Sequence, residues 1–134
     1  MTHADLLQLL PYRDAALWLH SIGDHDEDSI HGCCHADCLQ QLHEPATLML
    51  FEAAAQLCAA HGALYAGNEA VKAAHVGKIS GVRLHASLQP GPDLLQLRAT
   101  RLGHSGHSAL YAFDIRQQQQ PLLDGQLLVV LSHA

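Results

Sequence analysis

The residues best suited to chemistry lie in one apolar stretch of the chain. Glu52 stands between Phe51 and Ala53. Burial disfavours the charged form of a carboxyl group, so we expect a raised pKa for Glu52, which suits a group that donates a proton near neutral pH. Gln56 follows four residues later; on a helix it would share a face with Glu52 and could orient it. The alternatives are an ordinary surface carboxylate and a polar residue of the core.

Histidine is the other unusual feature of the sequence. There are 12 histidines against 7 lysines and arginines, and histidine both titrates near neutral pH and is the commonest metal ligand. His35 and His43 precede the apolar stretch, and either could project into a pocket at its start. His61 is expected to be a packed core histidine. Turns and termini hold His3, His25, His104, His107 and His133.

A cysteine cluster raises the possibility of a metal site. The segment 33–38 reads Cys-Cys-His-Ala-Asp-Cys, and Cys58 is the fourth cysteine. Structural zinc sites usually use two separated ligand pairs, and the sequence has no second cluster of cysteine and histidine to supply the other pair. We therefore expect neither metal nor cofactor, with structural zinc as an alternative. The N-terminal residues lack the features of a signal peptide, so reduced thiols and a cytoplasmic location are expected.

Composition limits the class of protein. A length of 134 residues fits a single domain over residues 1–134. The net charge of −6 argues against nucleic acid as a partner. The apolar stretch 46–66 is nearly long enough to span a bilayer, but it carries Glu52, Gln56 and His61 and has no basic flanks. We therefore expect no membrane insertion.

The pattern along the chain predicts an α+β fold. A helix from Pro45 to about Ala66 is apolar on most sides and should be buried. Leu, Val and Ile-rich segments separated by Gly and Pro joints read as strands. We expect one long central helix wrapped by a curved antiparallel sheet of about six strands, the last four forming a meander. The expected elements are a short helix at 4–10 and strands at 15–22, 29–35, 76–88, 94–102, 109–116 and 122–131.

Several motifs in this order resemble a known family. The helix carries Phe-Glu-Ala-Ala-Ala-Gln at 51–56 and His-Gly-Ala-Leu at 61–64. Together they resemble hotdog-fold 3-hydroxyacyl-[acyl carrier protein] dehydratase-like proteins, including the aryl-polyene-type variant. The remaining matching segments are Leu-Leu-Pro-Tyr-Arg at 9–13, Gly-Lys-Ile-Ser-Gly-Val-Arg-Leu at 77–84, Pro-Gly-Pro-Asp-Leu at 90–94 and Asp-Gly-Gln-Leu-Leu-Val-Val-Leu at 124–131.

The resemblance implies dehydration of a 3-hydroxyacyl thioester to a trans-2-enoyl thioester in fatty-acid or aryl-polyene-like biosynthesis. Glu52 would be the acid and His35 or His43 the base, with His35 modestly favoured by its place at the end of a strand. Free amides near Pro45 and Thr47, together with Gln56, would bind substrate. Related dehydratases carry a "GHFPxxPxxPG" segment before the helix, and residues 34–45 lack it.

Two other functions remain open on the same residues. A hotdog acyl-thioesterase would use Glu52 to activate water. A catalytically inactive hotdog subunit would bind an acyl chain or pair with an active partner. The expected ligand is an acyl thioester carried by acyl carrier protein or coenzyme A. The expected protein partner is a second copy of the chain, with a second hotdog subunit as the alternative. A patch of Arg83, Arg98 and Arg101 could receive an acidic carrier.

Overall fold

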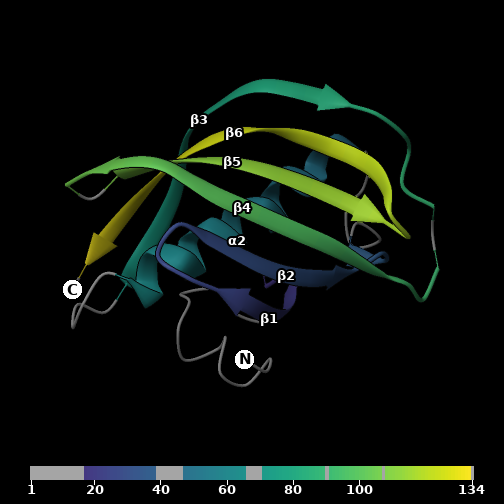
Figure 1. The fold of residues 1–134 in the computed structure, drawn as a ribbon, viewed down its shortest axis with the longest axis horizontal. Helices are drawn as coiled ribbons and strands as arrows, with labels where there is room; N and C mark the ends of the chain where they lie inside the picture. Colours follow the sequence, from purple (N-terminus) through teal and green to yellow (C-terminus); the bar gives the residue numbers. More distant parts are fainter. Residues whose placement is uncertain (1–16, 39–46, 66–70, 90, 107, 134) are drawn as a thin grey trace.

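One helix lies inside a curved antiparallel sheet (Figure 1). The computed structural model describes residues 17–38, 47–65, 71–89, 91–106 and 108–133. The helical part is a 3-10 turn, η3 (Thr47–Leu50), continued by α2 (Phe51–Leu64). The strands are β1 (Leu19–His25), β2 (Ser29–His35), β3 (Val71–Leu84), β4 (Leu94–Ser105), β5 (Ser108–Gln117) and β6 (Gln120–His133). The expected α+β fold is thus confirmed; the helix expected at 4–10 lies outside the described residues.

The strand order corrects one expectation. The six described strands form one sheet in the order β1-β2-β4-β5-β6-β3, and every neighbouring pair is antiparallel. Strands β4, β5 and β6 form a meander, but β3 pairs with β6 at the far edge and not with β4. Neighbouring strands in sequence are usually neighbours in a sheet. Here α2 carries the chain from β2 to the opposite edge, which leaves the place beside β2 for β4.

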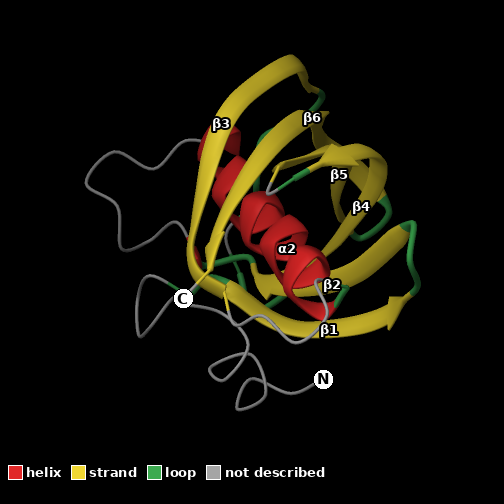
Figure 2. Ribbon diagram, turned by 90° about the vertical axis from the view of Figure 1, so that its left-hand side faces the viewer, coloured by secondary structure: helices red, strands yellow, loops and turns green. Residues whose placement is uncertain are grey.

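The core lies between the helix and the concave face of the sheet (Figure 2). Every residue from Ala53 to His61 is buried, which confirms that α2 is an internal helix. Strand β4 alternates as expected for a sheet with one buried face: Leu95, Leu97 and Ala99 are buried and the residues between them are exposed.

Local features explain where the elements begin and end. A β-bulge follows Leu19, and β1 continues to His25, beyond the end at residue 22 that the sequence predicted for this strand. Strand β3 begins at Val71, before the expected start. The glutamine run forms the tight turn of the β5–β6 hairpin, where Gln118 and Gln119 take φ angles of 50° and 68°, as a two-residue turn with two left-handed residues requires.

The helical segment has the length and composition of a membrane span. In Thr47–Leu64 the mean hydropathy is 1.2 and 56% of the residues are buried inside the fold. Core helices of soluble proteins meet the same criteria, so this is weak evidence for a span.

Candidate active site at the start of the buried helix

Glu52 lies in the first turn of α2 and is half-buried. Burial raises the pKa of this carboxyl above its ordinary value of 4.5, and the hydrogen bond from Gln56 opposes that rise. The Gln56 amide donates from Nε2 to Glu52 Oε1 over 3.5 Å. The direction of the pKa shift and the contact between Gln56 and Glu52 agree with the sequence-based expectations, and the catalytic role of Glu52 stays a prediction.

Gln56 is fully buried and joins α2 to the start of β1. Its Oε1 accepts hydrogen bonds from the backbone N–H of Trp18 at 2.8 Å and of Leu19 at 3.1 Å. Since a carboxamide has one acceptor oxygen and one donor nitrogen group, fixing Oε1 on β1 directs Nε2 toward Glu52. Gln56 therefore anchors the start of β1 and positions the carboxyl, whichever substrate role it has.

The start of the helical segment holds a hydroxyl group that is hydrogen-bonded within the fold, followed by two exposed apolar side chains. Thr47 Oγ1 accepts a hydrogen bond from the Leu88 N–H at 2.9 Å and so fixes the segment that follows β3. No side chain caps α2 at Leu50. Leu48 and Met49 are 49% and 37% exposed. An apolar surface thus lies one turn from the half-buried carboxyl.

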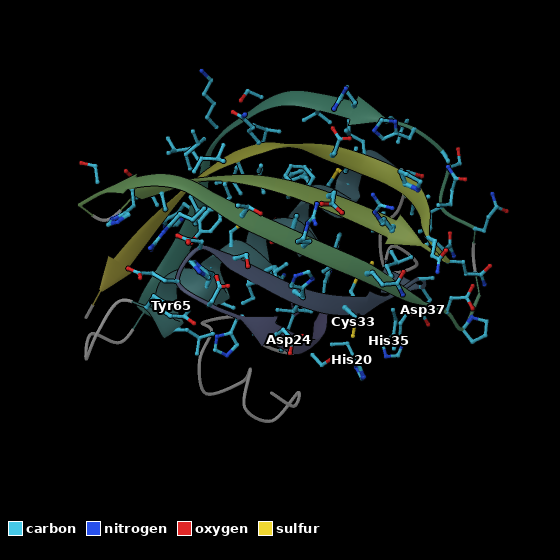
Figure 3. The ribbon with its side chains drawn as sticks, in the orientation of Figure 1. His20, Asp24, Cys33, His35, Asp37 and Tyr65 are labelled. Carbon is cyan, nitrogen blue, oxygen red and sulfur yellow. The ribbon has the colours of Figure 1, made fainter. Side chains whose placement is uncertain are left out.

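The structure places His35 away from Glu52 within one chain. Strand residues alternate between faces, and on β2 the fully buried Cys34 faces the helix while His35 is exposed on the other face. The His35 ring packs edge-on against His20, with ring centroids 4.5 Å apart (Figure 3). The expectation that His35 projects into a pocket at the helix start is therefore wrong for a single chain. His43 and Pro45 lie outside the described residues.

The cysteine cluster is divided between the two faces of the sheet. All four cysteines are free. Cys33 Sγ shares a hydrogen bond of 2.9 Å with Ser21 Oγ on the outer face, whereas the buried Cys34 thiol bonds with Cys38. Within the described ranges, no three His, Cys, Asp or Glu side chains gather as they would around a metal ion.

His61 lies toward the other end of α2 and is fully buried, as expected of a core histidine. Its Nε2–H donates to the Asp26 carbonyl oxygen at 2.8 Å, so in the neutral ring Nδ1 accepts from the Tyr111 hydroxyl, also at 2.8 Å. Burial lowers the pKa of His61. Sequence reasoning did not identify Tyr111 as its partner, because the two residues are 50 positions apart.

Comparison with known proteins defines the fold. No protein-family model matches the chain, and no curated protein matches its sequence. Solved structures do match. A chain of the dehydratase heterocomplex ApeI:P from Xenorhabdus doucetiae aligns with a TM-score of 0.83 at 12% identity, over 95% of this chain and 90% of that one.

Two further structures extend the comparison. Cj0977, a sigma28-regulated virulence protein from Campylobacter jejuni, gives a TM-score of 0.68 at 15% identity and covers 95% of both chains. A mutant of the thioesterase PA1618 from Pseudomonas aeruginosa gives 0.59 at 11% identity, over 88% of this chain and 84% of that one. The chain thus has the hotdog fold, which both a dehydratase and a thioesterase share.

Proposed function

We propose that this hotdog chain acts on acyl thioesters, and that it dehydrates a 3-hydroxyacyl thioester to a trans-2-enoyl thioester. The observation that carries the proposal is Glu52: its carboxyl is half-buried, its pKa is raised by that burial, and it is held by Gln56. The exposed side chains of Leu48 and Met49 lie close by along the chain and offer an apolar surface to an acyl group.

The proposed reaction needs an acid, a base and a stabiliser of negative charge. The base takes the proton from C2, the C3–O bond breaks, and the protonated Glu52 gives its proton to the departing hydroxyl, which leaves as water. Backbone N–H groups at the start of the helical segment stabilise the enolate-like oxygen. The proton held by the base then returns to Glu52. We assign the base to His43 or to His35 of a second copy. His35 of the same chain is not assigned this role, because its side chain faces away from the helix.

Two alternatives have observations in their favour. The likeness to a thioesterase favours hydrolysis, with Glu52 as the base that activates water. Against this, the raised pKa of Glu52 favours a protonated carboxyl that acts as an acid. The likeness to a chain of a dehydratase heterocomplex, together with the outward-facing His35, favours a subunit that completes its site with a second hotdog chain.

The assembly we propose uses the free edge of β3. Among the described strands, β3 is bonded only to β6 and spans 14 residues, twice the length of the other edge strand, β1. Ile79 and Leu84 on this strand are 38% and 56% exposed. An exposed strand edge is a template for pairing with another chain. We expect a homodimer, or a pair with a second hotdog subunit, in the cytoplasm.

A direct assay tests the proposal. The purified chain is incubated with acyl and 3-hydroxyacyl thioesters of coenzyme A and of acyl carrier protein. Absorbance of the conjugated enoyl thioester reports dehydration, and release of free thiol reports hydrolysis. We expect enoyl formation, and a loss of about 10²- to 10⁴-fold in rate for Glu52→Gln.

Glu27→Gln is the matched control, because it makes the same chemical change at an exposed position. It should leave the rate unchanged. Thiol release without enoyl formation would establish hydrolysis in place of dehydration. A lack of both activities that is relieved only by a second hotdog chain would establish the subunit alternative.

A further inference from the structure

A hollow of about 400 Å³ lies on the face of the sheet that is turned away from α2. It spans the four neighbouring strands β4, β5, β6 and β3, which Figure 1 shows side by side above the helix. We call it the arginine hollow, because three of its lining residues are Arg83, Arg98 and Arg116. The chain has only 7 lysines and arginines and a net charge of −6, so this gathering of cations is a local exception.

Strand register aligns the charges in one row across the hollow. Arg98 on β4 stands opposite Asp114 on β5, Asp114 stands opposite Asp124 on β6, and Asp124 stands opposite Arg83 on β3. Like charges directly opposite each other destabilise a sheet. The arginines offset this: Arg98 Nε donates to Asp114 at 3.0 Å, and Arg83 Nε donates to Asp124 at 3.1 Å.

These ion pairs orient the guanidinium groups without using all their donors. A guanidinium has five N–H groups, and each of the two hydrogen bonds uses the Nε–H. The third arginine, Arg116, approaches Asp114 through Nε at 3.5 Å. The side chains of Arg83, Arg98 and Arg116 are 74%, 55% and 48% exposed. Their Nη groups are therefore within reach of a ligand in the hollow.

The charges and donors of the lining favour an anion with several oxygen atoms. Three guanidinium groups face two carboxylates, which leaves an excess of positive charge. His85 Nε2 lies 2.6 Å from Asp124 Oδ2 and holds this carboxylate from a further side. At Gly81 an added Cβ would meet no atom within 4 Å, so the β3 side of the hollow is open. Arginine binds phosphate oxygens in pairs through its planar set of donors, and such charge-assisted bonds are strong.

We propose that the arginine hollow binds a phosphoryl group, as free phosphate or diphosphate or as the phosphoester of a larger ligand. The site is separate from Glu52, which lies on the helix side of the sheet. The patch expected from sequence contained Arg101 in place of Arg116. In the structure Arg101 lies near Tyr111 and His61, and its backbone N–H donates to the backbone carbonyl oxygen of Asp28 at 2.7 Å.

Calorimetric titration of the full chain with pyrophosphate, coenzyme A and pantetheine tests the site. Pyrophosphate and coenzyme A carry phosphoryl groups and pantetheine does not. We expect pyrophosphate to bind, and its binding to weaken as the salt concentration is raised. Pantetheine lacks a phosphoryl group and should not compete with pyrophosphate. If coenzyme A binds as well, and the arginine variant described below weakens that binding, the hollow accepts a phosphoester. If pyrophosphate binds and coenzyme A does not, the site is confirmed for the free anion.

The double variant Arg83→Gln/Arg98→Gln should bind pyrophosphate at least about tenfold more weakly. It leaves Asp114 with Arg116 and Asp124 with His85, so both carboxylates keep a neighbour. The control Lys78→Gln/Arg101→Gln removes the same charge from residues outside the hollow and should bind as the wild type does. Equal weakening of pyrophosphate binding in both variants, or unchanged binding in the first, would overturn the proposal.

Discussion

Glu52 is a carboxyl that the folded chain holds at a cost. Its pKa in the fold lies above the ordinary value of 4.5 because of burial. At a pH above the folded pKa, the carboxyl is ionised in surroundings that favour its neutral form, and the free energy of unfolding is lower. Below about pH 4.5 the carboxyl is protonated in both the folded and the unfolded chain, and this loss of stability disappears. This behaviour agrees with the catalytic role that we propose for Glu52, because perturbed pKa values are common at functional sites.

The variant Glu52→Gln should therefore be more stable than the wild type at pH 7. The gain should stay below about 1 kcal/mol, because the side chain is half-exposed and solvent screens the effect. The difference should vanish as the pH falls below 4.5. Urea denaturation of both proteins at neutral and at acid pH measures this. A variant that is less stable at pH 7 would show that the ionised carboxylate stabilises the fold.

His61 is the opposite case, a titratable residue that serves the fold. Replacing it with Ala removes two hydrogen bonds and leaves the buried Tyr111 hydroxyl without its partner, so we expect a loss of about 2–4 kcal/mol. Because burial lowers its pKa, the unfolded chain takes up the proton first as the pH falls below 6.5. The wild type should lose stability there, and His61→Ala should lose less.

Thermal denaturation between pH 5 and 8 follows both effects of the His61 change. His104→Ala is the control, because His104 is an exposed histidine near the end of β4. It should leave stability almost unchanged. A destabilisation by His104→Ala equal to that by His61→Ala would contradict a specific role for the buried histidine.

Sequence reasoning succeeded at single residues where the evidence was local. Glu52 and Gln56 stand four positions apart on an apolar helix, so their shared face followed from helix geometry. The roles that depend on distant segments could not be found this way. Tyr111 reaches His61 from another strand, and the side of β2 that His35 occupies depends on the register that buries Cys34.

At the scale of elements, close contact between α2 and β2 depends on Gly32. A Cβ added there would lie 2.8 Å from Leu57 Cδ1 and 3.0 Å from the Ser21 carbonyl oxygen. Helix and strand would have to move apart, and overpacking of this kind costs about 1–3 kcal/mol. We expect Gly32→Ala to lower the melting temperature. Gly103→Ala is the matched control, because a Cβ there would meet no atom within 4 Å. Equal effects of the two substitutions would show that the close approach is unimportant.

The elements themselves were largely predictable, and their order in the sheet was not. Apolar segments between turn-rich joints predicted β2 over the same residues, Ser29–His35, and placed β4, β5 and β6 within a few residues of their ends. The pairing of β3 with β6 joins residues as far apart as Val71 and His133. No local pattern encodes such a contact, since the helix between β2 and β3 can lead the chain to either edge.

At the scale of the whole molecule, the free edge of β3 predicts self-association. The strand is long, it is bonded only to β6 among the described strands, and it exposes Ile79 and Leu84. Light scattering at micromolar concentration should give twice the mass of one 14.5 kDa chain. Ile79→Lys/Leu84→Lys should shift the protein to a monomer, because charges on an edge strand oppose pairing.

If the active site is completed by a second copy, this variant should also lose enoyl formation while keeping its fold, as measured by circular dichroism. The control is Leu102→Lys, which places the same charge at an exposed leucine on β4, away from the edge strand. It should leave the dimer intact. A monomeric wild type, or a dimer that survives the double substitution, would show that β3 is not the interface.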